Sequence, residues 1–207
     1  MFISPRPTGS VFAEHRLSNT RFAIVIYQLS LRAAGILVGL LLLVLGGFGL
    51  LSPGFFQSAA KQLPRSRIAG IVLLTIALIW SVWLLATIEM GEFASFRRPL
   101  LIALPIGYVL VIRFVDEFLA VRALGILCLL AAEPLIDAAF LRYGLSRLVV
   151  TVFAYILVIA GLFWVTMPYL LRDQINWTLT SNTRWRLVNG VVLVYGVITL
   201  AFAITKF

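Results

Sequence analysis

Seven ionisable side chains gather around one apolar stretch in the middle of this 207-residue chain. Two of them, Glu133 and Asp137, stand four positions apart, a spacing that places two carboxylates on one helix face, where they can share a proton or a cation. Charged groups inside a membrane are costly and usually pair or line a water-filled path, so this set is the candidate functional site. It comprises Arg113, Asp116, Glu117, Arg122, Glu133, Asp137 and Arg142.

A structural interpretation of the same residues competes with the functional one, and we favour it. Glu133 precedes Pro134, and proline favours the first turn of a helix. Both acids can therefore occupy a helix amino terminus at the water interface, where they complement the helix dipole. The acids at 116–117 then form a turn between two short helices, with an arginine on either side as a counter-ion.

The sequence offers no other residue set suited to catalysis or ligand binding. Its one histidine, His15, lies in a polar segment, and its one cysteine, Cys128, lies in an apolar run. A histidine-ligated haem or metal centre, a disulfide and a thiolate cluster are therefore not expected. We find no glycine-rich phosphate loop, nucleophile elbow or HExxH motif. The sequence predicts a protein that is not an enzyme and has no catalytic, cofactor or metal residues.

Small residues in the first apolar run predict close helix packing. Gly35 and Gly39 form a GxxxG pair, and Gly46 follows two turns later. Small residues at such spacings let two helices approach closely within a membrane. The partner helix can belong to this chain or to another subunit, and we favour this chain.

The elements that carry these residues are predicted from composition. Hydrophobic side chains make up 62% of the chain, charged ones 12%, and the mean hydropathy is +1.06. Soluble domains are about half apolar and a quarter charged, and about 20 apolar residues cross a bilayer core. We therefore predict an all-α, polytopic integral membrane protein whose single helical domain covers 33–207. Its six spans are 33–51, 68–88, 99–115, 118–133, 148–166 and 187–205. The third and fourth are the shortest, and could instead form a hairpin or a partly re-entrant element.

Polar and amphipathic segments flank the spans. Residues 1–32 read as a polar or interfacial arm. The stretches after Pro53 and Pro168 carry apolar residues at helical spacing, which predicts two short helices in the plane of the interface. Aromatic residues around the second are typical of an interfacial belt, namely Trp164, Tyr169, Trp177 and Trp185.

A weak internal repeat is consistent with these elements. Gly46, Phe48 and Pro53 recur 115 positions later as glycine, phenylalanine and proline. In both places a span, an interfacial segment and a second span follow one another. Either a duplication or a chance recurrence in a glycine-rich membrane protein explains the pattern.

Basic residues limit the choice of partner and location. The net charge is +9, but the 17 lysines and arginines lie mainly at the edges of apolar runs, where they read as lipid and water anchors rather than a nucleic-acid surface. They divide nine to eight between the two sides of a six-span arrangement, so the preference for cytoplasmic termini is slight. We expect a multi-pass protein of the cell membrane, with a bacterial inner membrane favoured, and a lipid bilayer as its main surroundings.

Three functions remain compatible with these features. The favoured one is a non-catalytic accessory, scaffolding or assembly subunit that contacts other membrane subunits. The alternative is a small repeat-built transporter or channel, acting as a homo-oligomer, with a polar path near Arg122, Glu133 and Asp137. A third, a subunit that holds a pigment or quinone, needs ligands from the backbone, water or partner chains, because His15 alone cannot serve.

Overall fold

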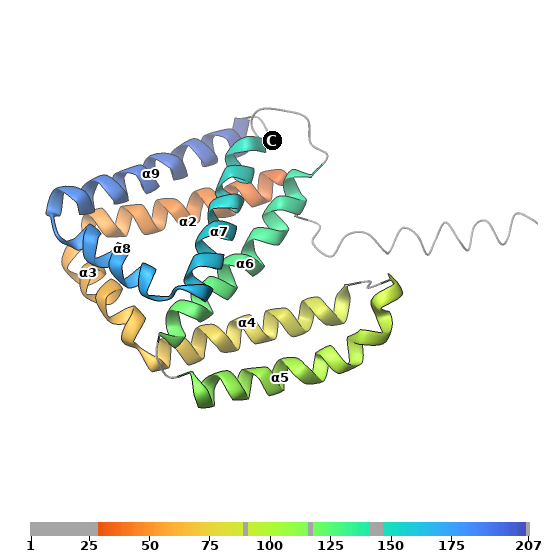
Figure 1. The fold of residues 1–207 in the computed structure, drawn as a ribbon. Helices are drawn as coiled ribbons and strands as arrows, with labels where there is room; N and C mark the ends of the chain where they lie inside the picture. Colours follow the sequence, from red (N-terminus) through yellow and green to blue (C-terminus); the bar gives the residue numbers. More distant parts are fainter. Residues whose placement is uncertain (1–28, 89–90, 116–117, 141–146, 206–207) are drawn as a thin grey trace, which may run out of the picture.

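The computed structural model describes residues 29–88, 91–115, 118–140 and 147–205, and every regular element in these ranges is a helix (Figure 1). Six of the helices are long and apolar enough to cross a membrane, as the sequence predicts. The elements are α2 (Leu31–Leu51), α3 (Pro53–Gln62), η1 (Leu63–Arg65), α4 (Arg67–Thr87), η2 (Gly91–Phe96), α5 (Arg97–Phe114), α6 (Leu119–Ala139), α7 (Arg147–Thr166), α8 (Tyr169–Leu179) and α9 (Asn182–Thr205).

Local chemistry explains where several helices begin. Ser30 accepts a hydrogen bond from the backbone N–H of Ala33 and caps α2, and Ser66 caps α4 in the same way through Ala69, each at 3.1 Å. These bonds satisfy backbone donors that a helix start leaves free. Pro53 occupies the first turn of α3, a position where its missing N–H costs nothing.

The long helices pack mainly in pairs. In Figure 1, α2 and α9 lie side by side and run in opposite directions, and α7 lies along α6. α6 also contacts α4. Within the described residues, the only long helix that α5 contacts extensively is α4. No residue of α5 is buried, whereas ten residues of α6 are, so α6 is central and α5 is peripheral.

Glycines set the spacing between α2 and α9. A methyl group at Gly46 would lie 2.8 Å from the backbone nitrogen of Leu193, and one at Gly39 would lie 3.0 Å from that of Leu200. Gly196 approaches α2 equally closely from the other side. The first span therefore packs through its glycines against another helix of the same chain, as we favoured, and that helix is α9. Gly35 is also buried in α2.

A second glycine pair joins α6 and α7. A methyl group at Gly125 would lie 2.9 Å from the carbonyl oxygen of Gly161, and one at Gly161 would lie 2.8 Å from that of Gly125. The two backbones therefore meet directly, as small residues permit in membrane helix pairs. Gly70 lets the start of α4 approach Leu119 and Ala120 of α6 in the same manner.

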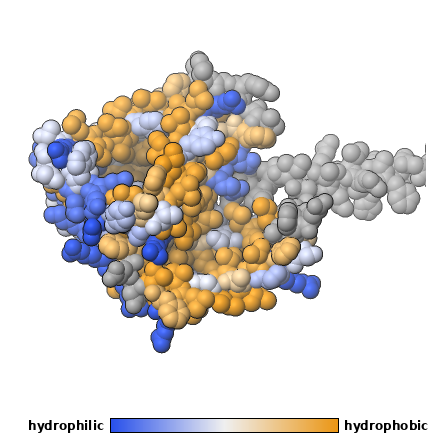
Figure 2. All heavy atoms as spheres, in the orientation of Figure 1, coloured by the Kyte–Doolittle hydropathy of each residue, from blue (hydrophilic) through white to orange (hydrophobic). Residues whose placement is uncertain are grey.

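The two short helices after Pro53 and Pro168 are present as predicted. They are α3 and α8, they lie next to each other at one end of the helix bundle, and hydrophilic residues gather around them in Figure 2. α3 buries no residue and α8 buries only Leu171. Trp177 is 57% exposed on α8, whereas Trp185 is only 5% exposed, so Trp185 belongs to the core rather than to an interfacial belt.

The order of elements is the same in α2–α3–α4 and α7–α8–α9, but the packing is not. Gly46 of α2 meets α9, while Gly161, its counterpart 115 positions later, meets α6. The correspondence between the two segments therefore covers local structure and does not extend to the choice of neighbouring helix.

The fourth span is longer than predicted. We placed its end at residue 133 from the extent of the apolar run, but α6 continues through Pro134 to Ala139. Membrane helices tolerate an internal proline when their neighbours supply the lost contacts, and Pro134 is buried. The third span, α5, and the fourth both have the length and hydropathy of full crossings.

Candidate polar site

The structure describes four of the seven candidate residues. Arg113 lies in the last turn of α5, Arg122 in the first turns of α6, and Glu133 and Asp137 in its last turns. The remaining three lie outside the described residues, namely Asp116, Glu117 and Arg142.

The four described residues do not meet at one place. Arg122 and Glu133 are separated by eleven positions on α6, which corresponds to about 16 Å along the helix axis. Arg113 ends the helix that precedes α6, so it lies toward the same end as Arg122. The set therefore divides into an arginine end and an acidic end, roughly half a bilayer apart.

Glu133 and Asp137 share one face of α6, as their spacing predicts. Both side chains are exposed and line a surface cavity of about 450 Å³ between α6 and α7. The other lining residues are apolar, namely Leu129, Ala132, Ile136, Phe140 and Val158. The acidic pair is therefore a small charged area within apolar surroundings.

The predicted helix amino terminus at these acids is wrong. Glu133 and Asp137 occupy the carboxyl-terminal turns of α6, where the helix dipole disfavours negative charge. Two carboxylates at this spacing also repel each other when both are ionised. No ion pair joins either acid to another residue in the described ranges. Within the described chain, neither a helix dipole nor a counter-ion stabilises the negative charge of the pair.

Arg122 at the opposite end of α6 is half-buried. Its Nε atom is buried and has no hydrogen-bond partner among the residues that the structure describes. Nearby, Arg172 of α8 lies over the ring of Phe118, with its Cζ 5.7 Å from the ring centroid. Phe118 precedes α6 with a φ of 56°, a left-handed conformation that is uncommon for a bulky residue. This cation–π contact joins the interfacial helix α8 to the start of α6.

A buried polar contact between α2 and α9 was not predicted. Trp185 donates its indole N–H to the carbonyl oxygen of Gly49 at 2.8 Å, and Asn189 donates to the carbonyl oxygen of Trp185 at 2.9 Å. Asn189 also fills the space beside Gly49, where a methyl group would overlap its amide. The signal in the sequence was an asparagine inside an apolar run, four positions after a tryptophan. Its role is helix packing rather than chemistry.

The described ranges hold no group of three or more histidine, cysteine, aspartate or glutamate residues that could bind a metal ion. Cys128 is a free, half-buried thiol in α6. It lies in the middle of the span and does not line the cavity that holds the acidic pair.

Over the described residues, the fold and the site define an all-α protein with six potential membrane-spanning helices, two short surface helices and an exposed acidic pair on its central helix. Comparison with protein families finds no matching family model, and comparisons with curated proteins and with solved structures find no significant similarity.

Proposed function

We propose that this chain is a non-catalytic accessory or assembly subunit of a membrane complex, and that Glu133 and Asp137 contact a basic residue of a partner subunit. The acidic pair is the observation that carries the proposal. With α6 spanning the bilayer, Glu133 lies about 9 Å inside the helix end. A charged carboxylate at membrane depth is destabilised by a few kcal/mol unless it finds a counter-charge.

The placement of the pair supports a lateral partner. Both side chains point outward from the paired helices α6 and α7 and lie in an apolar surface cavity. A membrane helix with an arginine or lysine at the matching depth would fill the cavity and neutralise the acids. The separation of the arginine end from the acidic end argues against a single polar path along α6.

Mutation of the acidic pair tests this proposal. The chain and a Glu133→Gln/Asp137→Asn variant are solubilised gently from native membranes, and co-migrating chains are quantified by mass spectrometry. We expect a stoichiometric partner with the original chain and at least about tenfold less with the variant, because losing one side of a desolvated charge pair costs a few kcal/mol.

Asp173→Asn is the matched control. Asp173 is an exposed acid on α8 that pairs with Arg172 at 3.1 Å, so its loss should leave the partner in place. Migration of the original chain alone would contradict the proposal. Equal recovery of the partner by the double variant would contradict the role of the acids.

Transport is the second candidate, because two carboxylates four residues apart line one cavity and can share a proton or cation. It requires a homo-oligomer in which a neighbouring copy encloses the acidic pair. In that case the chain migrates as a homo-oligomer, and Glu133→Gln abolishes proton or cation flux in vesicles.

A further inference from the structure

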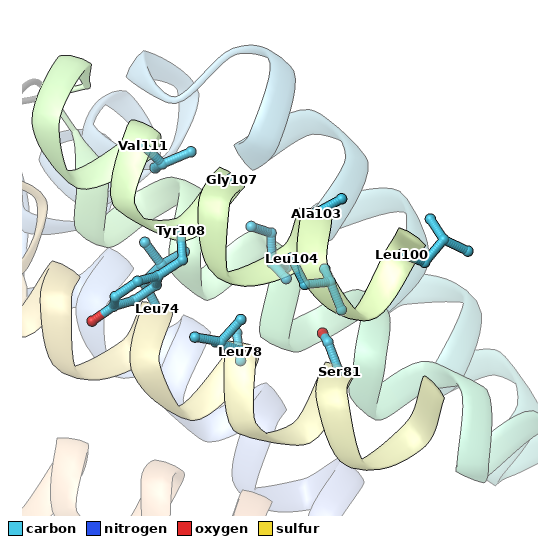
Figure 3. A pocket seen from close by; sticks show the side chains of 11 residues that line it. Leu74, Leu78, Ser81, Leu100, Ala103, Leu104, Gly107, Tyr108 and Val111 are labelled. Carbon is cyan, nitrogen blue, oxygen red and sulfur yellow. The ribbon is translucent and has the colours of Figure 1, made fainter. Parts of the chain in front are cut away.

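A second cavity lies between α4 and α5, away from the acidic pair. It has a volume of about 310 Å³, at the lower end of cavities that hold small ligands. Eleven residues line it, and none of them is charged. Figure 3 shows Leu78, Leu104 and Tyr108 directed into the space between the two helices.

The cavity is a groove that follows the helix axis. Its lining residues on α5 run from Leu100 to Val111, which corresponds to about 16 Å. One leaflet of a bilayer core measures about 15 Å. The groove therefore has the length and the apolar character of one extended acyl chain.

The far end of the groove is apolar although it contains a tyrosine. The hydroxyl of Tyr108 is 2.7 Å from the hydroxyl of Thr75, which also donates to the carbonyl oxygen of Ile71. Because these polar atoms satisfy one another, Tyr108 presents its ring rather than its hydroxyl to the groove. No hydrogen-bonding ligand group is needed there.

An arginine precedes the near end of the groove, at the start of α5. Arg97 precedes Leu100 by three positions and Leu104 by seven, so it lies on the groove face of α5 by helical spacing. It donates through Nη2 to the carbonyl oxygen of Ile88, while its buried Nε has no hydrogen-bond partner among the described residues. Because Arg97 is half-buried and its guanidinium carries five N–H donors, the donors that remain accessible at the edge of the hydrocarbon layer are suited to a phosphate group.

We infer that this groove binds one acyl chain of a membrane phospholipid, with the lipid phosphate held at Arg97. The recognised group is the phosphate that these lipids share, because its oxygens accept hydrogen bonds from a guanidinium. The lipid covers α5, the one span that buries no residue within the described chain. This inference is independent of the acidic pair and of the function proposed above.

Glycine variants test the groove. Gly107 lines it, and a methyl group built there meets nothing within 4 Å, so we expect Gly107→Leu to extend into the groove. Gly47 of α2 has equally open surroundings away from the groove, so Gly47→Leu is the matched control. Delipidated protein in detergent receives phosphatidylethanolamine, and native mass spectrometry measures the fraction that retains one lipid.

We expect Gly107→Leu to reduce lipid retention by about tenfold and Gly47→Leu to leave it unchanged, since excluding the chain removes most of its apolar contact. Thermal unfolding of both variants checks that they are folded, and Ala103→Leu replaces Gly107→Leu if the latter is not. Equal retention by the folded groove variant and the control would overturn the inference.

The headgroup requires a separate measurement with the same protein. Diacylglycerol with identical chains lacks the phosphate and should be retained about tenfold less, as should phosphatidylethanolamine by Arg97→Gln. Arg98 is exposed and lies off the groove face, so Arg98→Gln is the control. Equal retention of diacylglycerol and phospholipid would overturn the assignment of the phosphate to Arg97.

Discussion

A glycine in a helix of this protein allows close packing only where another helix lies opposite it. Gly46 and Gly47 are neighbours in sequence, yet a methyl group at Gly46 would meet the backbone of α9 and one at Gly47 would meet nothing within 4 Å. The sequence predicts tight packing of the first span from its small residues. It does not tell which of two adjacent glycines faces the partner, because that depends on the rotation of α2 against α9.

Gly46→Leu should therefore destabilise the protein by about 1–3 kcal/mol or more, since overpacking must push α9 away from α2. Gly47→Leu should change stability by less than about 0.5 kcal/mol, as expected for a substitution without new contacts. Thermal or denaturant unfolding in detergent measures both. A Gly46→Leu variant as stable as Gly47→Leu would show that the α2–α9 contact is looser than the structure has it.

The charged residues show the same dependence on position. Sequence spacing correctly predicts that Glu133 and Asp137 share a helix face. It also suggested one cluster of seven residues, but the four described members lie toward opposite ends of α6. Residues of one span that are many positions apart cannot meet, because each residue adds about 1.5 Å along the helix axis.

Among the long helices, α5 is attached to the rest of the described bundle by the fewest contacts. It packs on α4 and buries no residue, and a hydrogen bond between Tyr108 and Thr75 at 2.7 Å joins the two helices. Side-chain hydrogen bonds between membrane helices contribute about 0.6 kcal/mol on average. This bond adds to an apolar contact in which Tyr108, Val111 and Ile112 pack against a buried cluster that includes Leu74.

Tyr108→Phe should lower stability by roughly 0.6 kcal/mol and increase the cleavage of α5 by protease in detergent. Tyr155→Phe is the control, because Tyr155 is 55% exposed on α7 and no hydrogen bond of its hydroxyl is found in the described chain. Equal cleavage of the two variants would mean that the hydroxyl contact does not hold α5 in place.

At the scale of the whole molecule, the short helices α3 and α8 lie together at one end, and η2 lies at the opposite end of α4 (Figure 1). This arrangement follows from an even number of spans between the two short helices. It predicts which exposed positions share a side of the membrane, without deciding which side is cytoplasmic.

Cysteine labelling tests this arrangement. In a Cys128→Ala background, Ser58→Cys on α3 and Thr180→Cys after α8 should react with a membrane-impermeant thiol reagent from the same side of sealed vesicles. Ser95→Cys in η2 should react from the other side. All three positions are exposed. Labelling of Ser58→Cys and Thr180→Cys from opposite sides would contradict the six-span arrangement.

The sequence by itself determined the class of fold and most helix bounds, because apolar length and the lack of charge decide whether a segment can cross a bilayer. It also indicated both short helices through their amphipathic spacing. Only the tertiary structure decided that α9 is the partner of α2, that Pro134 lies inside a continuous α6, and that Trp185 is buried. These features depend on contacts between segments far apart in the chain. Local propensity and hydropathy carry no information about which helix faces which.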